Sequence, residues 1–151
     1  MLSRPRILIV DDDEEIRLTM KAILEDEGYL VDLAVSGKQA IGMTQETRYN
    51  LALLDIRLPD IEGVELLKLI KDGLPKVRKV MLTGYPSLQN AVAALNKNAD
   101  AYLIKPVSLD ELLKVVKDQL KLQQDENAFN EGKVAEFVDS RVKKLMADHV
   151  N

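Results

Sequence analysis

Cysteine and tryptophan are both absent from this chain of 151 residues, and aromatic side chains make up only 4% of it. Without cysteine the protein can form neither disulfides nor zinc–thiolate sites, and it has no thiol nucleophile. The single histidine, His149, cannot build a histidine metal cluster alone. Because aromatic residues are scarce while 46% of the residues are hydrophobic, the core must be mainly aliphatic.

The sequence also has no apolar run close to the length of a membrane-spanning helix. Acidic residues follow the first apolar run too early for a secretory signal peptide. The formal net charge of -4 argues against a nucleic-acid-binding surface spread over the chain. We therefore expect a cytoplasmic protein that neither contacts membranes nor binds nucleic acid directly.

Short apolar runs, each followed by an amphipathic stretch, occur five times. The predicted strands are Arg6–Val10, Leu30–Ala34, Leu51–Leu54, Lys79–Leu82 and Ala101–Ile104. Three of them are almost entirely apolar, as is typical of strands buried on both faces of a parallel sheet, whereas Asp32 suits an edge position for the second. Five such units predict an α/β fold with helices on both faces of a parallel sheet.

Five helices are expected between and after these strands. Ser36 and Ser108 are the predicted N-caps of the second and fifth helices. Gly28 is expected to end the first helix, and Pro86 to open the fourth.

The composition becomes polar after about residue 122. We interpret residues 1–122 as the domain, 123–132 as a polar linker and 133–149 as an additional amphipathic helix. The apolar stripe of this helix contains Val134, Phe137, Val138, Val142 and Leu145. The stripe could pack back on the domain, pair with another chain or extend as a coiled coil into a further domain.

The residues that follow the strands carry the chemistry, because ligands of such sheets bind beyond the carboxyl ends of the strands. Asp11 and Asp12 follow the first strand, and Asp55 follows the third. Thr83 follows the fourth and Lys105 the fifth. Three close carboxylates repel one another unless a cation neutralises them, and oxygen ligands suit Mg²⁺ or Mn²⁺.

Each of these residues also has an ordinary structural explanation. The acids after the first strand could merely cap a helix, as we expect Asp13 to do, and Asp55 could start a turn. Thr83 could be a simple turn residue and Lys105 a solvated lysine. Their joint placement at strand ends favours a site in which Asp55 is the nucleophile for a phosphoryl group.

Four motifs resemble those of response-regulator receiver domains, the phosphoacceptor family of two-component systems that includes the CheY-like proteins. They are Ile7–Asp12, Leu53–Pro59 with Gly63, Met81–Gly84 and Ala101–Pro106. The resemblance covers about residues 5 to 121. It implies a flavodoxin-like doubly wound sheet of order 2-1-3-4-5 with five helices, to which the C-terminal helix is an addition.

The resemblance also implies roles for the site residues. Asp55 resembles the phosphoacceptor, Asp12 the acid that contacts Mg²⁺ directly, and Asp11 its partner. The backbone carbonyl of Arg57 is implied as a further metal ligand. Thr83 resembles the switch hydroxyl.

Four further expectations come from the same resemblance. Lys105 resembles the lysine that contacts the phosphoryl group, and its peptide bond to Pro106 is expected to be cis. Tyr102 resembles the aromatic residue that turns inward during switching. Arg57 and Tyr85 occupy positions that tune dephosphorylation, and their size favours a long-lived phosphoryl form.

The implied partner is a sensor histidine kinase that docks on the first predicted helix. The output is a downstream protein or a second copy, bound through the fourth helix, fifth strand and fifth helix, or through the C-terminal helix. The chain would be a stand-alone receiver or the N-terminal part of a longer regulator, and would catalyse only its own phosphoryl transfer and slow dephosphorylation. The alternatives are an Asp-nucleophile, Mg²⁺-dependent phosphatase, which usually has a second Asp where Arg57 stands, and a pseudo-receiver without chemistry.

Overall fold

The computed structural model describes residues 4–70, 72–73, 75–84 and 99–148. One parallel sheet contains the five strands β1 (Arg6–Val10), β2 (Leu30–Ala34), β3 (Leu51–Asp55), β4 (Arg78–Thr83) and β5 (Ala101–Ile104). The helices are α1 (Glu14–Asp26), α2 (Gly37–Glu46), α3 (Gly63–Leu69) and α5 (Leu109–Asp148). The strand order β2-β1-β3-β4-β5 confirms the predicted flavodoxin-like sheet. The helix expected from Pro86 lies outside the described residues.

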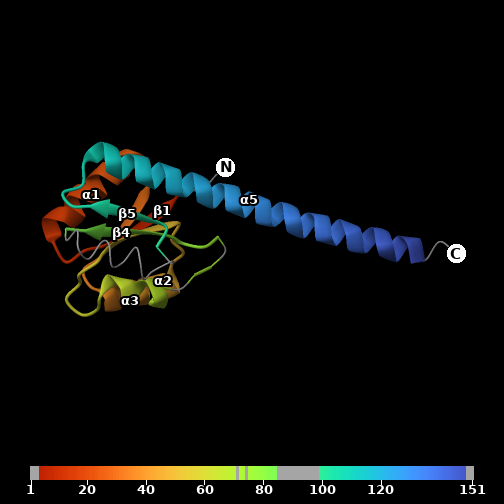
Figure 1. Ribbon diagram of the computed structural model, residues 1–151, viewed down its shortest axis with the longest axis horizontal. Helices are drawn as coiled ribbons and strands as arrows, with labels where there is room; N and C mark the ends of the chain where they lie inside the picture. Colours follow the sequence, from red (N-terminus) through yellow and green to blue (C-terminus); the bar gives the residue numbers. More distant parts are fainter. Residues whose placement is uncertain (1–3, 71, 74, 85–98, 149–151) are drawn as a thin grey trace.

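The sheet separates two hydrophobic layers, because alternate residues of a strand point to opposite faces. In β1, Leu8 and Val10 pack in the layer that contains α2 and α3, whereas Ile7 and Ile9 pack in the layer of α1 and α5. Figure 1 shows these helix pairs on opposite sides of the sheet. The central strands are therefore buried on both faces, as their apolar sequences predicted, and β2 lies at the predicted edge.

Local sequence signals set several helix boundaries. The side chains of Asp13, Ser36 and Ser108 each accept a hydrogen bond from a backbone N–H three residues further on, at 3.1–3.2 Å. Gly28 follows α1 with a φ of 97°, a left-handed conformation that glycine adopts without steric cost. All four residues therefore have the capping or terminating role predicted for them.

The segment 123–132 is helical, so the predicted linker is wrong. Helix α5 runs without a break for 40 residues, from the domain through this segment and beyond it. Figure 1 shows its second half projecting far from the sheet. Although α5 is long, neither it nor any other helix within the described ranges is apolar enough to cross a membrane.

A buried glutamine explains why the polar segment stays helical. Gln123 is only 3% exposed. Its Nε2 donates to the backbone carbonyls of Asn50, at 2.8 Å, and Lys76, at 2.7 Å, which precede β3 and β4. Its Oε1 accepts a bond of 3.0 Å from Nδ2 of Asn50. The amide of Gln123 thus joins α5 to the base of the sheet, the end where the strands begin.

Arg78, the first residue of β4, adds a second set of contacts. It donates two hydrogen bonds to Oε1 of Gln119, at 3.0 and 2.8 Å, and one to Oε1 of Glu126 at 3.0 Å. Gln119, Gln123 and Glu126 are spaced by four and three residues, so they share one face of the helix. We call these three residues and their partners Asn50 and Arg78 the polar latch.

Gln123→Ala should lower the free energy of unfolding by about 1–3 kcal/mol, because it leaves buried carbonyls and an amide without partners. The neighbouring Gln124 is exposed, so Gln124→Ala is the matched control and should change stability little. Urea denaturation followed by circular dichroism measures both values. Equal stabilities of the two variants would show that the latch contributes nothing.

Candidate functional site

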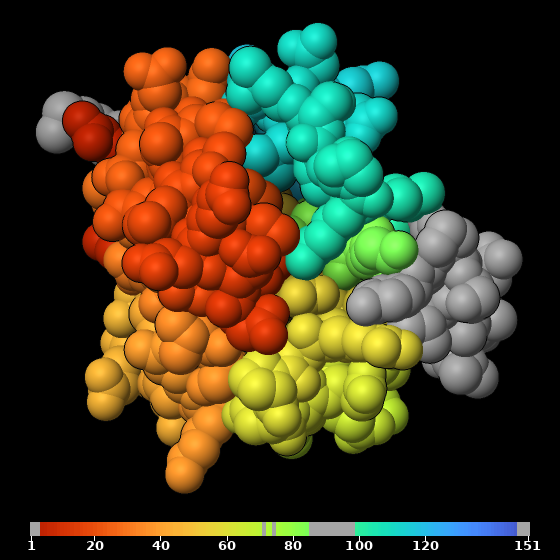
Figure 2. Space-filling view, turned by 90° about the vertical axis from the view of Figure 1, so that its left-hand side faces the viewer, coloured from red at the N-terminus to blue at the C-terminus, as the bar shows by residue number. Residues whose placement is uncertain are grey.

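The carboxyl ends of four strands meet at one rim of the domain. Asp11 and Asp12 follow β1 directly, and β3 and β4 end at Asp55 and Thr83. Lys105 follows β5. Figure 2 shows this rim, where the red, yellow, green and teal segments after these strands come together. The helix α5 projects from the opposite end of the domain.

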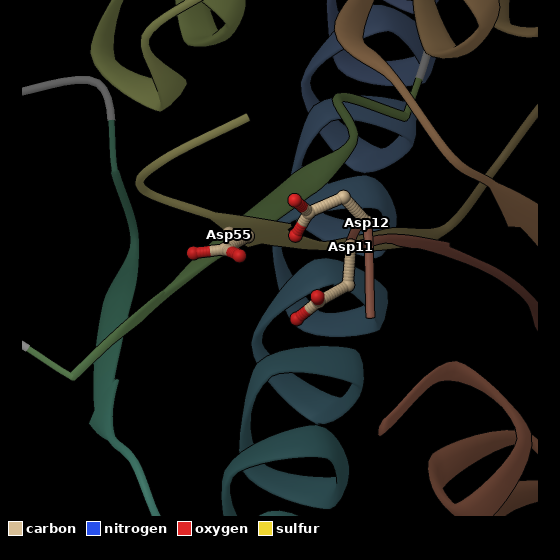
Figure 3. A group of neighbouring side chains, drawn as sticks. All are labelled: Asp11, Asp12 and Asp55. Carbon is tan, nitrogen blue, oxygen red and sulfur yellow. The ribbon is translucent and has the colours of Figure 1, made fainter. Parts of the chain in front are cut away.

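The three predicted acids form one cluster. Asp11, Asp12 and Asp55 each offer a carboxylate oxygen, and these oxygens lie within 4.8 Å of one another. Figure 3 shows the side chains of Asp11 and Asp12 extending from the end of β1 toward the side where Asp55 stands. Asp11 is fully buried, Asp55 is 7% exposed and Asp12 is exposed. The cluster thus has two buried members and one that faces solvent.

Lys105 bridges the two buried carboxylates. Its Nζ lies 2.9 Å from Oδ2 of Asp11 and 3.2 Å from Oδ2 of Asp55. Burial acts to lower the pKa of Lys105, but the hydrogen bond to Asp11 and the negative charges of Asp55 and Asp11 outweigh it, so this pKa is raised. The ammonium group therefore stays charged where it can contact an anion bound to the cluster.

Backbone amides hold the other oxygen of each buried carboxylate. Oδ1 of Asp11 accepts a hydrogen bond from the N–H of Asp13 at 2.9 Å, and Oδ1 of Asp55 accepts one from the N–H of Arg57 at 3.2 Å. Each buried acid is therefore oriented by an amide on one side and by Lys105 on the other. Such fixed carboxylates suit a reaction that needs positioning more than acid–base chemistry.

The pKa of Asp55 is raised, mainly because burial disfavours the charged carboxylate. The N–H of Arg57 and the ammonium group of Lys105 lower this pKa, and the charge of Asp11 raises it further. These attractive contacts do not compensate for burial, so the ionised form of Asp55 is disfavoured in the fold.

A divalent cation fits the composition of this cluster. With three carboxylates and one ammonium group, the four side chains carry a formal charge of -2 when all are ionised. The ligand atoms are all oxygens, and the exposed Asp12 leaves one side open to solvent. Hard cations such as Mg²⁺ prefer oxygen ligands and retain part of their hydration shell. The residues that the sequence selected as metal ligands therefore fit such an ion.

Gly63 has a positioning role that the sequence showed only as part of a motif. Its N–H donates to the carbonyl of Ile56 at 2.8 Å. A Cβ at this position would lie 2.6 Å from the carbonyl oxygen of Asp55 and 2.8 Å from Cα of Ile56. Only glycine allows the start of α3 to approach the strand end that carries Asp55 so closely.

Asp60 is a second positioning residue, which sequence reasoning missed. Its carboxylate accepts hydrogen bonds from the N–H groups of Gly37, at 2.9 Å, and Lys38, at 2.8 Å, in the first turn of α2. These bonds lower its pKa. They fasten the loop after Asp55 to the neighbouring helix. Since the partners lie more than twenty residues apart, no local pattern could have revealed the pairing.

Thr83 and Lys105 lie side by side at the rim. Thr83 is 1% exposed, and its carbonyl accepts a hydrogen bond of 2.7 Å from the N–H of Lys105. The peptide bond between Lys105 and Pro106 is cis, as expected. The structure therefore brings Thr83 next to the lysine that bridges the acid cluster.

The remaining predicted site residues are Tyr102, Arg57 and Tyr85. Tyr102 on β5 is half-buried against the layer that contains α2 and α3, and burial raises its pKa. The side chain of Arg57 is exposed at the rim. The metal-binding role of its carbonyl stays a prediction. Tyr85 lies outside the described residues.

Comparison with known proteins gives a consistent result. Residues 7–117 match the family described as "Response regulator receiver domain". The crystal structure of a CheY-like receiver domain protein from Methanospirillum hungatei is 48% identical, with a TM-score of 0.75. The match covers 82% of this chain and 99% of that one.

Three curated relatives are longer than this chain. ZraR from Klebsiella oxytoca is 42% identical over 70% of the chain and 24% of its own length. AlgB from Pseudomonas aeruginosa is 38% identical over 79% of the chain and 26% of its own length. MprA from Mycobacterium bovis is 33% identical over 96% of the chain and 60% of its own length. The chain thus spans about a quarter of the first two relatives and under two thirds of the third.

The raised pKa of Asp55 predicts a pH-dependent effect of Asp55→Asn on stability in the presence of a chelator. Above the ordinary value of 3.8, the ionised carboxylate destabilises the folded protein increasingly as the pH rises through its folded-state pKa. Asp55→Asn should therefore unfold at a higher urea concentration than the wild type at about pH 7, with a smaller difference at about pH 4. A constant difference over this range would contradict the prediction.

Proposed function

We propose that the chain acts as a two-component switch that accepts a phosphoryl group on Asp55. The proposal starts from the family to which the chain belongs, the response-regulator receiver domains. Members of this family are signalling switches rather than enzymes acting on a metabolite. The observation that carries the proposal is the buried carboxylate of Asp55, held 3.2 Å from the ammonium group of Lys105 beside two further acids. The comparisons give no support to the phosphatase alternative.

The proposed reaction is a direct displacement at phosphorus. A carboxylate oxygen of Asp55 attacks the phosphorus of a phosphohistidine or a small phosphodonor, the bond from phosphorus to the donor breaks, and an acyl phosphate forms. Water later attacks the same phosphorus, which restores the carboxylate and releases inorganic phosphate. The chain contributes orientation through the N–H of Arg57 and positive charge through Lys105.

We assign the cation site to Asp11, Asp12 and Asp55, with the carbonyl of Arg57 as a further ligand. Mg²⁺ or Mn²⁺ bound there would neutralise the charge on the carboxylates and on the incoming phosphoryl group. The net formal charge of -2 on the four side chains supports this assignment. Lys105 alone leaves the cluster negative, which opposes approach of an anion.

Thr83 and Tyr102 are assigned to the switch. A phosphoryl group on Asp55 adds negative charge and acceptor oxygens beside Lys105. The hydroxyl of Thr83 would donate to one of these oxygens, and Tyr102 would follow by moving inward. The half-buried position of Tyr102 supports this role, because a modest movement changes the surface around β5. The switched surface would bind a downstream protein.

A groove beside the rim suits the kinase. It has a volume of about 430 Å³ and lies between α1 and the start of α5. Ile16, Met20 and Leu109 contribute apolar surface to it, and Lys105 also lines it. A helix of a sensor histidine kinase docked there would bring its phosphohistidine next to Asp55.

The output and the location stay predictions. Two of the relatives are named transcriptional regulatory proteins and are about four times as long as the matched segment. The chain would accordingly be the N-terminal part of a longer cytoplasmic regulator or a receiver that acts alone. Direct contact with nucleic acid is not assigned to this chain.

Phosphorylation is tested by incubating the protein with Mg²⁺ and acetyl phosphate and measuring its intact mass. The wild type should gain one phosphoryl group, whereas Asp55→Asn should gain none because it lacks the nucleophile. Asp26→Asn is the matched control, since Asp26 is an exposed aspartate at the end of α1, away from the rim, and it should still be modified. An unmodified wild type, or a modified Asp55→Asn, would rule out the proposal.

We also expect Arg57 to slow the loss of the phosphoryl group by screening it from water. Arg57→Ala should shorten the lifetime of the phosphorylated form several-fold, because it removes the side chain but keeps the N–H that orients Asp55. Lys68→Ala is a control that removes an exposed cation from α3, away from the rim. The time course of intact mass after removal of the phosphodonor gives the lifetimes. Equal lifetimes in Arg57→Ala and the wild type would exclude a screening role.

A further inference from the structure

The projecting part of α5, residues 127–148, has an apolar stripe that nothing in the described chain covers. Its large apolar side chains are between 47% and 65% exposed. They are Val134, Phe137, Val138, Val142, Leu145 and Met146. At the rise of an α-helix this segment extends for about 33 Å. Helices in proteins are stabilised mainly by packing of an apolar face, so burial of this stripe against a partner would stabilise the projecting segment.

The stripe lies on the same side of α5 as the domain. Leu112, Val116, Leu120 and Gln123 are the residues by which α5 packs on the sheet. Val134, Val138, Val142 and Leu145 each follow one of them by 22 residues. Twenty-two residues make about six helical turns, so both sets share one face of the helix. A partner of the stripe must therefore lie directly below the base of the sheet.

This position restricts how two copies can pair. In a parallel pair the stripes would face each other across the interface. Because each domain lies on the same side of α5 as its stripe, each domain would extend toward the partner helix, at the same level along the helix axis as the other domain. The two domains would then occupy the same space. In an antiparallel pair the domains lie at opposite ends, and only the projecting segments overlap.

The charges along the segment favour the antiparallel arrangement. Residues 127–139 contain Glu131, Glu136 and Asp139 but only Lys133 as a base, which gives a formal charge of -2. Residues 140–148 contain Arg141, Lys143, Lys144 and Asp148, which gives +2. An antiparallel pair sets the basic end of each helix against the acidic part of the other, whereas a parallel pair aligns like charges.

The centre of the stripe, Val134, Val138 and Val142, is symmetric about Val138, whereas the counterpart of Leu145 is Glu131. Val134 and Val142 lie four residues before and after it, and positions 131 and 145 lie a further three residues away. Placing Val138 opposite its equivalent therefore sets 134 against 142 and 131 against 145 throughout the overlap. This register brings the tip of each helix to the base of the other domain.

A hollow at that base can receive the tip. It has a volume of about 550 Å³ and lies between α5 and the segment before β4. Pro75 and Lys76 line it on the domain side, and Glu126, Glu131 and Val134 are among the residues that line it on the helix side. The two acids suit the basic residues near the tip of a second helix.

We propose that residues 127–148 bind the same segment of a second copy as an antiparallel helix pair. Three observations support this: the side of α5 on which the stripe lies, the distribution of charge along the segment, and the hollow at the base of the domain. The interface is isologous, and it places the two phosphoacceptor rims at opposite ends of the dimer. The proposed pairing does not depend on phosphorylation. An experiment that finds no dimer therefore says nothing against phosphorylation of Asp55, and an unphosphorylated Asp55 says nothing against the dimer.

Sedimentation equilibrium of the full chain tests the pairing. The wild type should be a dimer at about 100 µM, and Val138→Asp should dimerise at least about tenfold more weakly because it buries a carboxylate in the interface. Ser140→Asp adds the same charge on the opposite face and should dimerise like the wild type. A monomeric wild type would overturn the proposal and leave the stripe to another protein or segment. Equal weakening by both variants would also overturn it.

The absence of cysteine makes the orientation testable by cross-linking. Glu131→Cys and Leu145→Cys should each give little cross-linked dimer alone with a short bis-maleimide, but a strong product when mixed and allowed to exchange. Val138→Cys should cross-link to itself and serves as the positive control. Strong self-cross-linking of Glu131→Cys and of Leu145→Cys would show a parallel pair and overturn the arrangement. Circular dichroism and the mass assay of Asp55 phosphorylation check that each variant is folded.

Discussion

The repulsion among three carboxylates at the rim is the constraint on which the site depends. Asp11 and Asp55 are buried, and the ammonium group of Lys105 lies within 3.2 Å of both. This contact opposes the repulsion, and the pKa of Asp55 still stays above its ordinary value, mainly because its carboxylate is buried. An ionised cluster with a net negative charge attracts a cation. The burial and crowding that disfavour ionised Asp55 in the fold would also prepare the rim for the proposed phosphoryl transfer.

The topology makes this concentration of charge possible. Because β1 lies between β2 and β3, Asp11 follows a buried interior strand that is paired directly with the strand that ends at Asp55. Gly63 lets the chain after β3 return close to Asp55, and the peptide groups of Asp13 and Arg57 hold one oxygen of each buried acid. The site is thus held mostly by backbone, which tolerates less variation in geometry than flexible side chains would.

Sequence reasoning succeeded where a local pattern corresponds to a local cause. Apolar runs located the strands, and single polar residues such as Ser36 located helix caps. It failed at residues 123–132, where polarity was taken as a sign of exposure. Gln123 is polar and buried, because its partners are backbone groups at the base of the sheet, some fifty to seventy positions earlier in the chain. The pairing of Asp60 with the start of α2 escaped notice for the same reason.

The corrected view of α5 changes what the helix can transmit. A flexible linker would let the segment beyond residue 132 move independently of the domain, whereas α5 is one continuous element that starts beside the rim and is fixed again at the base. Apolar contacts of Leu112 and Val116 hold its first turns, and the polar latch holds the turns around Gln123. A movement of the residues at the rim that reaches the start of α5 therefore has to shift the whole helix, or else deform the sheet on which the helix packs. Because the stripe continues the face that packs on the domain, rotation of α5 would alter both contacts together.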